Sequence, residues 1–188
     1  MSLTMLDIDR EAGNQQPDLT HYKGSFSPPR PLWIGFVLAI LYLGTGIAEV
    51  DNPEEAELWG TLVGLVGWMY WLVCVSRFHK ILAELSPLED GEPTYLFTPQ
   101  KSVLYHFIPL LNLYWAFRWP REMVKFLREQ TSVHIVSGWG LGAILFLALL
   151  LGGLGLFLVF GVGLYLSGKL RQAVAEREAV RGAAGVFG

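Results

Sequence analysis

Apolar residues along the chain gather into long runs that are separated by short charged segments. Four runs are of about membrane length, near residues 32–48, 58–76, 135–151 and 154–167. The last two would form one helix about 55 Å long, nearly twice the apolar thickness of a bilayer, unless they were interrupted. We expect the break at Gly152–Gly153. The pattern predicts an all-α membrane protein with four transmembrane helices arranged as two hairpins.

Polar segments flank this membrane domain, which we place at residues 31–170. Residues 1–30 form a polar tail without the pattern of a secretory signal, and residues 171–188 form a charged, then Gly/Ala-rich tail that we expect to be a short fraying helix. Acids precede the second apolar run. They suit either a cation site or a helix start, and we favour a start with Asp51 or Asn52 as cap and Pro53 first. This helix is expected to continue to Leu85.

The segment at about residues 101–129 differs from the four runs, because it is apolar but holds polar residues and prolines. Pro109 is expected to end or kink a helix at Ile108, and Pro120 to begin the next helix. Asn112 lies between two apolar stretches and is expected to satisfy backbone groups freed around Pro109. Trp115 and Trp119 suit the headgroup level. We therefore predict an interfacial or re-entrant helical segment between the two hairpins.

The end of this segment has the pattern of a helix lying on a membrane surface. From Arg121 to Gln130, apolar residues alternate with cations, so we expect the apolar face to lie in lipid and the cations to contact anionic headgroups. The apolar residues concerned are Met123, Val124, Phe126 and Leu127.

Charge fixes the expected orientation. If both termini are cytoplasmic and residues 101–129 do not cross, all 14 Lys and Arg residues lie on the cytoplasmic side, as the positive-inside rule requires. If the segment crossed instead, Arg118, Arg121, Lys125 and Arg128 would lie outside. The sequence therefore predicts a multi-pass protein with both termini inside, in the inner (cytoplasmic) membrane of a bacterium.

A family resemblance rests on the run from Tyr105 to Glu122. Phe107-Ile108-Pro109-Leu110-Leu111-Asn112-Leu113 resembles the F-[IV]-P-x-x-N-L core of a family of uncharacterised bacterial four-helix membrane proteins, catalogued as a domain of unknown function. In that family the core follows two spans and precedes two more. The resemblance implies this architecture over residues 31–170 and implies no activity.

Candidate chemistry is sparse, and we expect no enzymatic activity and no nucleic-acid binding. Gly163 to Lys169 matches GxxxxGK, but Leu170 stands where Mg²⁺ needs a hydroxyl. The single cysteine, Cys74, provides neither a disulfide nor a zinc site. His79, His106 and His134 fall near the expected cytoplasmic interface and are weak candidates for haem or pigment ligands, although interfacial hydrogen bonding is the favoured role. No cofactor or metal is predicted.

Small residues four apart occur in every predicted span and allow close helix packing, which we expect within the chain more than against a partner. The pairs are Gly35 and Ala39, Gly60 and Gly64, Gly138 and Gly142, and Gly163 and Ser167.

The apolar spans lack central charges, so we favour an accessory, structural or assembly subunit of a larger membrane complex, with membrane lipids and a membrane protein or a second copy as partners. The alternative is a small transporter, channel or lipid-handling protein with a cavity at the Pro109/Asn112 break, for which Asn112, His106, Arg118 and Arg121 are the site residues to test.

Overall fold

The computed structural model describes residues 31–48, 53–89, 92–93, 95 and 97–186. The polar tail 1–30 and the expected cap at Asp51 or Asn52 lie outside these residues. The described part is mainly helical, with one short β pairing in the linker after α3. Its elements are α2 (Trp33–Ala48), α3 (Pro53–Leu85), β1 (Leu88–Glu89), β2 (Glu92–Pro93), α4 (Pro99–Leu104), the 3-10 helix η2 (Tyr105–Phe107), α5 (Pro109–Gln130), α6 (Gly138–Leu150) and α7 (Gly153–Val186).

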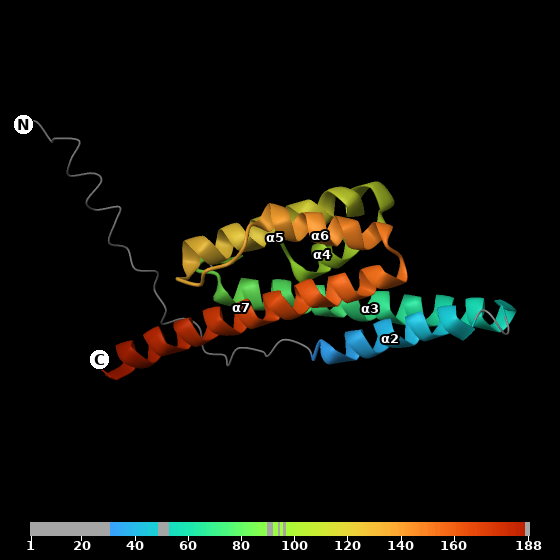
Figure 1. The fold of residues 1–188 in the computed structure, drawn as a ribbon. Coiled ribbons are helices and arrows are strands. Elements are labelled where there is room, and N and C mark those ends of the chain that lie inside the picture. Colours follow the sequence, from blue (N-terminus) through green and yellow to red (C-terminus); the bar gives the residue numbers. More distant parts are fainter. Residues whose placement is uncertain (1–30, 49–52, 90–91, 94, 96, 187–188) are drawn as a thin grey trace, which may run out of the picture.

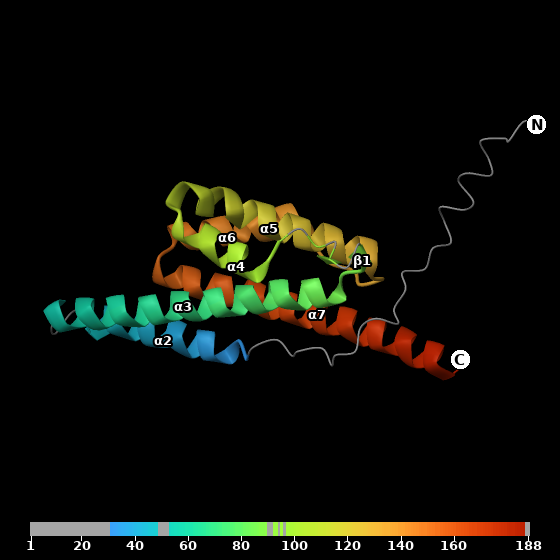
Figure 2. The same cartoon turned by 180° about the vertical axis from the view of Figure 1, so that it is seen from behind.

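The helices form two layers. Figures 1 and 2 show α5 and α6 side by side in one layer and α2, α3 and α7 in the other, with α4 between α5 and α3. Helix α7 packs against α6 on one side and against α2 and α3 on the other, so it joins the two layers. The aromatic and aliphatic core lies where α3, α5 and α7 meet.

Several helix ends follow the sequence pattern. Pro53 opens α3 with Glu54 and Glu55 in its first turn, and α3 continues to Leu85 as expected. The break between the last two apolar runs is confirmed at Gly152, whose φ of +53° is a left-handed value that favours glycine. The charged C-terminal residues, expected to be helical, are the continuation of α7, which runs as far as Val186.

The four expected spans are unequal in length. Two helices are long and apolar enough to cross a membrane, Pro53–Leu85 and Gly153–Val180, whereas Trp33–Ile47 and Gly138–Leu150 are shorter. Helix α6 begins only at Gly138, after an extended segment at residues 131–137. Its 13 residues give a length of roughly 20 Å, less than the apolar thickness of a bilayer.

Helix α5 contradicts the expected helix start at Pro120. It runs without interruption from Pro109 to Gln130, with Pro120 inside it. A proline in a helix leaves the carbonyl four residues earlier without its N–H partner. That carbonyl belongs to Ala116, and a Cβ added at Gly142 of α6 would lie 3.2 Å from its oxygen.

The apolar face of α5 contradicts the expected contact with lipid. Met123 and Leu127 are 0% exposed, and Val124 and Phe126 are also buried. Trp115 and Trp119, expected at the headgroups, are 1% exposed. An amphipathic pattern identifies an apolar face but not the surface that covers it. Here α3 and α7 extend past their apolar runs, and their buried residues Leu82 and Leu170 join the same core.

The small residues serve packing within the chain. A Cβ atom added at Gly60 or Gly64 would meet Thr45 or Tyr42 of α2, and one added at Gly138 or Gly142 would meet the backbone of α5. Gly35 lies against the Phe160 ring, and Gly163 lies against Trp71 and Leu32. The space beside each of these glycines is therefore filled by another part of the same chain.

We predict that Gly142→Ala destabilises the protein although alanine favours helix. The new Cβ would lie 2.9 Å from Cα of Phe117, so α5 and α6 must separate, at a cost of about 1–3 kcal/mol. Gly140→Ala is the matched control, because nothing lies within 4 Å of its Cβ position; it should be neutral or stabilising by about 0.5–1 kcal/mol. Thermal and denaturant unfolding in mild detergent measures both. Equal stability of the two variants would contradict the close α5–α6 contact.

Candidate functional site

The turn between α4 and α5 is built by side chains that hydrogen-bond to the backbone. Thr98 caps α4, its hydroxyl accepting from the Lys101 amide, and Pro99 takes the first helical position. The Ser102 hydroxyl donates to the Thr98 carbonyl at 3.0 Å. One turn later, Nδ1 of His106 lies 2.8 Å from the Ser102 carbonyl oxygen. These contacts direct His106 inward at the end of α4.

The chain reverses at Ile108 and Pro109. Ile108 has extended torsions, φ −99° and ψ 109°, as expected for a residue before proline. Pro109 then begins α5, and the Asn112 amide N–H donates to the Ile108 carbonyl at 2.7 Å. The backbone of Asn112 therefore closes the first turn of α5. Its side chain forms no hydrogen bond with any residue that the structure describes.

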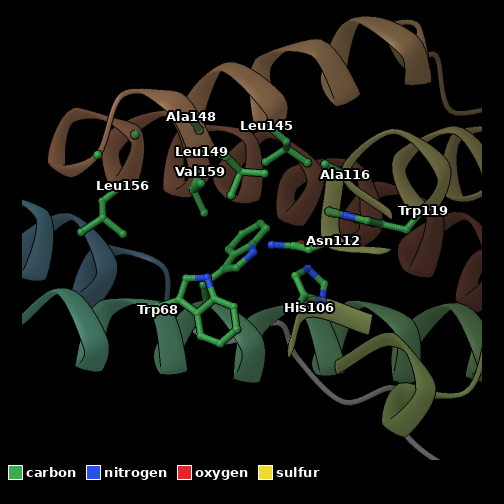
Figure 3. A pocket seen from close by; sticks show the side chains of 13 residues that line it. Trp68, His106, Asn112, Ala116, Trp119, Leu145, Ala148, Leu149, Leu156 and Val159 are labelled. Carbon is green, nitrogen blue, oxygen red and sulfur yellow. The ribbon is translucent and has the colours of Figure 1, made fainter. Parts of the chain in front are cut away.

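A partly enclosed cavity of about 200 Å³ lies beside this reversal. Figure 3 shows Asn112 and His106 together at one side of it, facing aliphatic side chains of α6 and α7. The cavity is lined by Trp68 and Trp71 of α3, His106, Asn112, Ala116 and Trp119, and by Leu145, Ala148, Leu149, Gly152, Gly155, Leu156 and Val159.

The cavity offers neutral hydrogen-bonding groups in an apolar, aromatic lining. A carbonyl oxygen only accepts, so Nδ1 of His106 must donate to Ser102, which leaves the lone pair of a neutral ring at Nε2. The Asn112 amide adds a donor and an acceptor. No Asp, Glu, Lys or Arg lines this cavity among the described residues. The arrangement suits a small neutral molecule with one polar group.

Aromatic rings enclose His79 of α3, among them those of Tyr95, Phe97 and Trp115. Its Nδ1 lies 2.9 Å from the Tyr95 hydroxyl, and its ring stacks on Trp115 at 6.3 Å between centroids. Burial, and then the Glu122 carboxylate, raise the pKa of Tyr95 well above its ordinary value, so the hydroxyl stays protonated. Nε2 of His79 and Nε1 of Trp115 have no hydrogen-bond partner among the described residues.

The expected site residues separate into two groups. Asn112 and His106 meet at the cavity. The guanidinium of Arg118 lies over the Phe97 and Tyr114 rings and donates to the Tyr114 hydroxyl, and that of Arg121 lies 5.3 Å from the Trp139 ring centroid. Both arginines are exposed and take no part in the cavity lining.

The three histidines suggested as haem or pigment ligands do not form one site. His79 and His106 are buried, whereas His134 is exposed on the extended segment before α6. Within the described residues no group of three His, Cys, Asp or Glu side chains is placed to hold a metal ion. A cavity of about 200 Å³ is also smaller than ordinary ligand pockets of about 300–1,000 Å³, and a porphyrin needs more space than a drug-sized molecule.

Sequence reasoning missed the residues that α3 and the linker contribute. Trp68 and Trp71 were assigned to an ordinary span, although a Trp-Met-Tyr-Trp run at the centre of a span is an available signal. Tyr95 lies outside every predicted element, yet its backbone N–H donates to the Ser86 hydroxyl and its ring contacts Phe126. These roles depend on which helices meet in space.

Comparisons with family models, with curated proteins and with solved structures find no match for this chain.

We predict that Tyr95→Phe destabilises the protein by about 1–2 kcal/mol, because His79 loses its hydrogen bond inside the core. Tyr105→Phe is the control: its ring also packs on Trp115, and its hydroxyl has no hydrogen bond to any described residue. Unfolding in mild detergent compares the two. A loss for Tyr105→Phe as large as that for Tyr95→Phe would contradict the role of the hydroxyl.

Proposed function

We propose that this chain is an integral membrane protein that binds a small amphipathic molecule in a cavity beside its re-entrant turn. The membrane part is supported by the two long apolar helices and by apolar side chains exposed on α2, α3 and α6, including Ile40, Leu65 and Leu150. Monomeric soluble proteins rarely expose apolar patches on this scale.

The proposed topology has four crossing helices and both termini in the cytoplasm of a bacterial cell. Helices α2 and α6 are short for a bilayer, so in this topology the bilayer thins locally around them or the residues that flank them complete the crossing. The hairpin of α4 and α5 dips in from the cytoplasmic face. In support, its tip exposes Phe107, Leu110 and Leu113, whereas Arg118 and the later cations of α5 follow the tip and face solvent.

The single observation on which the binding function rests is the pair of polar groups at the cavity. An amide such as that of Asn112 is costly in an apolar environment unless it is hydrogen-bonded. With His106 beside it, Asn112 gives the cavity an amide donor, an amide acceptor and the ring acceptor of His106, among tryptophan rings. A ligand with a hydroxyl or carbonyl group would hydrogen-bond to Asn112 or His106, and its apolar body would contact the tryptophan rings. We propose binding without catalysis, because no nucleophile stands beside a base in the lining.

The accessory-subunit hypothesis receives less support from the geometry. It was favoured because the spans lack central charges, and the small-residue pairs that could also have contacted a partner, Gly60 with Gly64 and Gly138 with Gly142, pack within the chain. A partner or a second copy would need another surface. The resemblance of residues 107–113 to the F-[IV]-P-x-x-N-L family stays a prediction, and it does not indicate what the cavity binds.

Reporter fusions test the topology. A reporter after residue 130 should be cytoplasmic, because the preceding hairpin does not cross, and a reporter after Gly152 should be outside. Paired alkaline phosphatase and green fluorescent protein fusions distinguish the two sides. An active phosphatase after residue 130 would overturn the re-entrant arrangement.

A cavity-filling variant tests the binding function with 2-naphthol, a neutral aromatic probe with one hydroxyl. Ala148→Phe should weaken its binding by at least about tenfold by occupying the cavity. Ala143→Phe on the exposed face of α6 should not. Asn112→Leu should weaken binding by about tenfold, the value of roughly one hydrogen bond. Tryptophan fluorescence of the full chain in mild detergent provides the measurement, since three tryptophans line the cavity. Equal binding by all variants would exclude this site.

A further inference from the structure

The backbone fixes which kind of hydrogen bond His106 offers to a ligand in the cavity. Its Nδ1 donates to the Ser102 carbonyl oxygen at 2.8 Å, so the lone pair of the neutral ring lies at Nε2. His106 lines the cavity and is 7% exposed, and Nε2 has no hydrogen bond to any residue that the structure describes. A ligand that pairs with Nε2 must therefore donate a hydrogen bond.

Asn112 supplies the complementary group. Its side-chain amide lies with His106 at one side of the cavity (Figure 3). A hydroxyl both donates and accepts, so one hydroxyl can donate to Nε2 of His106 and accept from the Asn112 amide N–H. A carbonyl oxygen has no proton to donate. It can pair with Asn112, but it leaves Nε2 of His106 unpaired and places one acceptor against another.

The remainder of the lining suits an aromatic ring. Trp68, Trp71 and Trp119 line the cavity, and the ring centroids of Trp71 and Trp119 are 6.3 Å apart. Aromatic rings pack favourably against one another in offset and edge-to-face arrangements. An apolar cavity of roughly 150 Å³ in another protein holds benzene, so the volume of about 200 Å³ here has room for one substituted ring.

Tryptophan rings also bind cations, but the lining does not favour a charged ligand. Among the described residues no Asp or Glu lines the cavity. A cation taken from water into this apolar space would have no counter-charge, which is costly. A neutral ring with a hydroxyl group avoids this cost.

The cavity opens beside the turn between α6 and α7. Two of its lining residues at this turn, Leu149 and Gly152, are exposed, Leu149 by 40%. Leu150 and Leu151, which follow Leu149, are also exposed, so the rim of the opening is apolar. In a bilayer such leucines contact acyl chains. A ring bound at His106 can therefore carry an apolar tail that leaves through this opening into lipid.

We propose that the cavity binds the ring of a lipid-soluble quinol, which is a hydroxylated aromatic ring on an apolar tail, and prefers this reduced form to the corresponding quinone. One quinol hydroxyl donates to Nε2 of His106 and accepts from Asn112, the ring lies among the three tryptophans, and the tail leaves beside Leu149. This inference rests on the proposed function, because it names the class of ligand that the same cavity takes.

Equilibrium dialysis of the full chain in mild detergent, under anaerobic conditions, tests the preference with duroquinol and duroquinone. The two probes share one carbon skeleton, and only the quinol has hydroxyl protons. The natural chain should bind duroquinol about tenfold more tightly, the value of roughly one hydrogen bond. Protein-free detergent gives the background for each probe. This comparison needs no variant, so it decides the matter even if a variant fails to fold.

Variants of two histidines locate the hydrogen bond. His106→Phe keeps a ring but removes the acceptor, so it should weaken duroquinol binding by about tenfold and leave duroquinone binding unchanged. His134→Phe is the matched control, because His134 is exposed on the extended segment before α6 and does not line the cavity. It should change neither affinity.

A third variant tests the path of the tail. Leu149→Asn should weaken binding of a decyl-substituted quinol by about fivefold relative to duroquinol, because the tail loses apolar contact at the opening. Leu147→Asn is the control, since Leu147 is similarly exposed on α6 and does not line the cavity. Equal loss of the two quinols in Leu149→Asn would contradict the proposed path.

The outcomes separate this inference from the proposed function. If duroquinone binds as tightly as duroquinol, or if His106→Phe weakens both equally, the quinol inference is overturned. If Ala148→Phe, which fills the cavity, then abolishes binding of both probes, the cavity still binds a ring and the proposed function stands. If Ala148→Phe leaves both affinities unchanged, the cavity is not the binding site, and the proposed function and the quinol inference are both overturned.

Discussion

The packing of the α5 aromatic face onto α3 is the contact on which the rest of the structure depends. Trp115 stacks on His79, and Trp119 lies close to both His79 and Trp71. Burying two large indole rings contributes on the order of several kcal/mol. This contact holds α5 along the bundle after the reversal at Pro109. Without it the cavity would lose the wall formed by Asn112, Ala116 and Trp119.

Close contact on the opposite side of α5 completes this arrangement. Gly138 and Gly142 bring α6 against the α5 backbone. The extended residues 131–137 that connect the helices are held by α7: the Ser132 amide donates to Glu176 at 2.9 Å, and the Val136 amide donates to the Tyr165 hydroxyl at 2.9 Å. Backbone groups outside a helix need such partners. Helix α7 therefore fixes both the direction in which α6 returns and the aliphatic wall of the cavity.

Polar groups in this apolar molecule occupy two different settings. His79 is fully enclosed by rings and bonded through one nitrogen to Tyr95, so it stabilises the core. His106 and Asn112 stand at an open space, and the backbone contacts of α4 and the first turn of α5 fix their positions. Histidine thus has a structural role on α3 and a proposed binding role at the turn between α4 and α5, because one site has room for a ligand and the other has none.

The sequence by itself determined the helical class, the start and end of α3 and the break at Gly152, because run length, proline and glycine act through local backbone geometry. It also singled out Asn112 and His106 as polar residues in an apolar segment. Only the tertiary structure decided what covers each apolar face. Periodicity made Met123 and Leu127 one face of a helix, but whether lipid or protein covers that face depends on where α3 and α7 end. The cavity likewise forms between helices distant in sequence, and no local pattern specifies it.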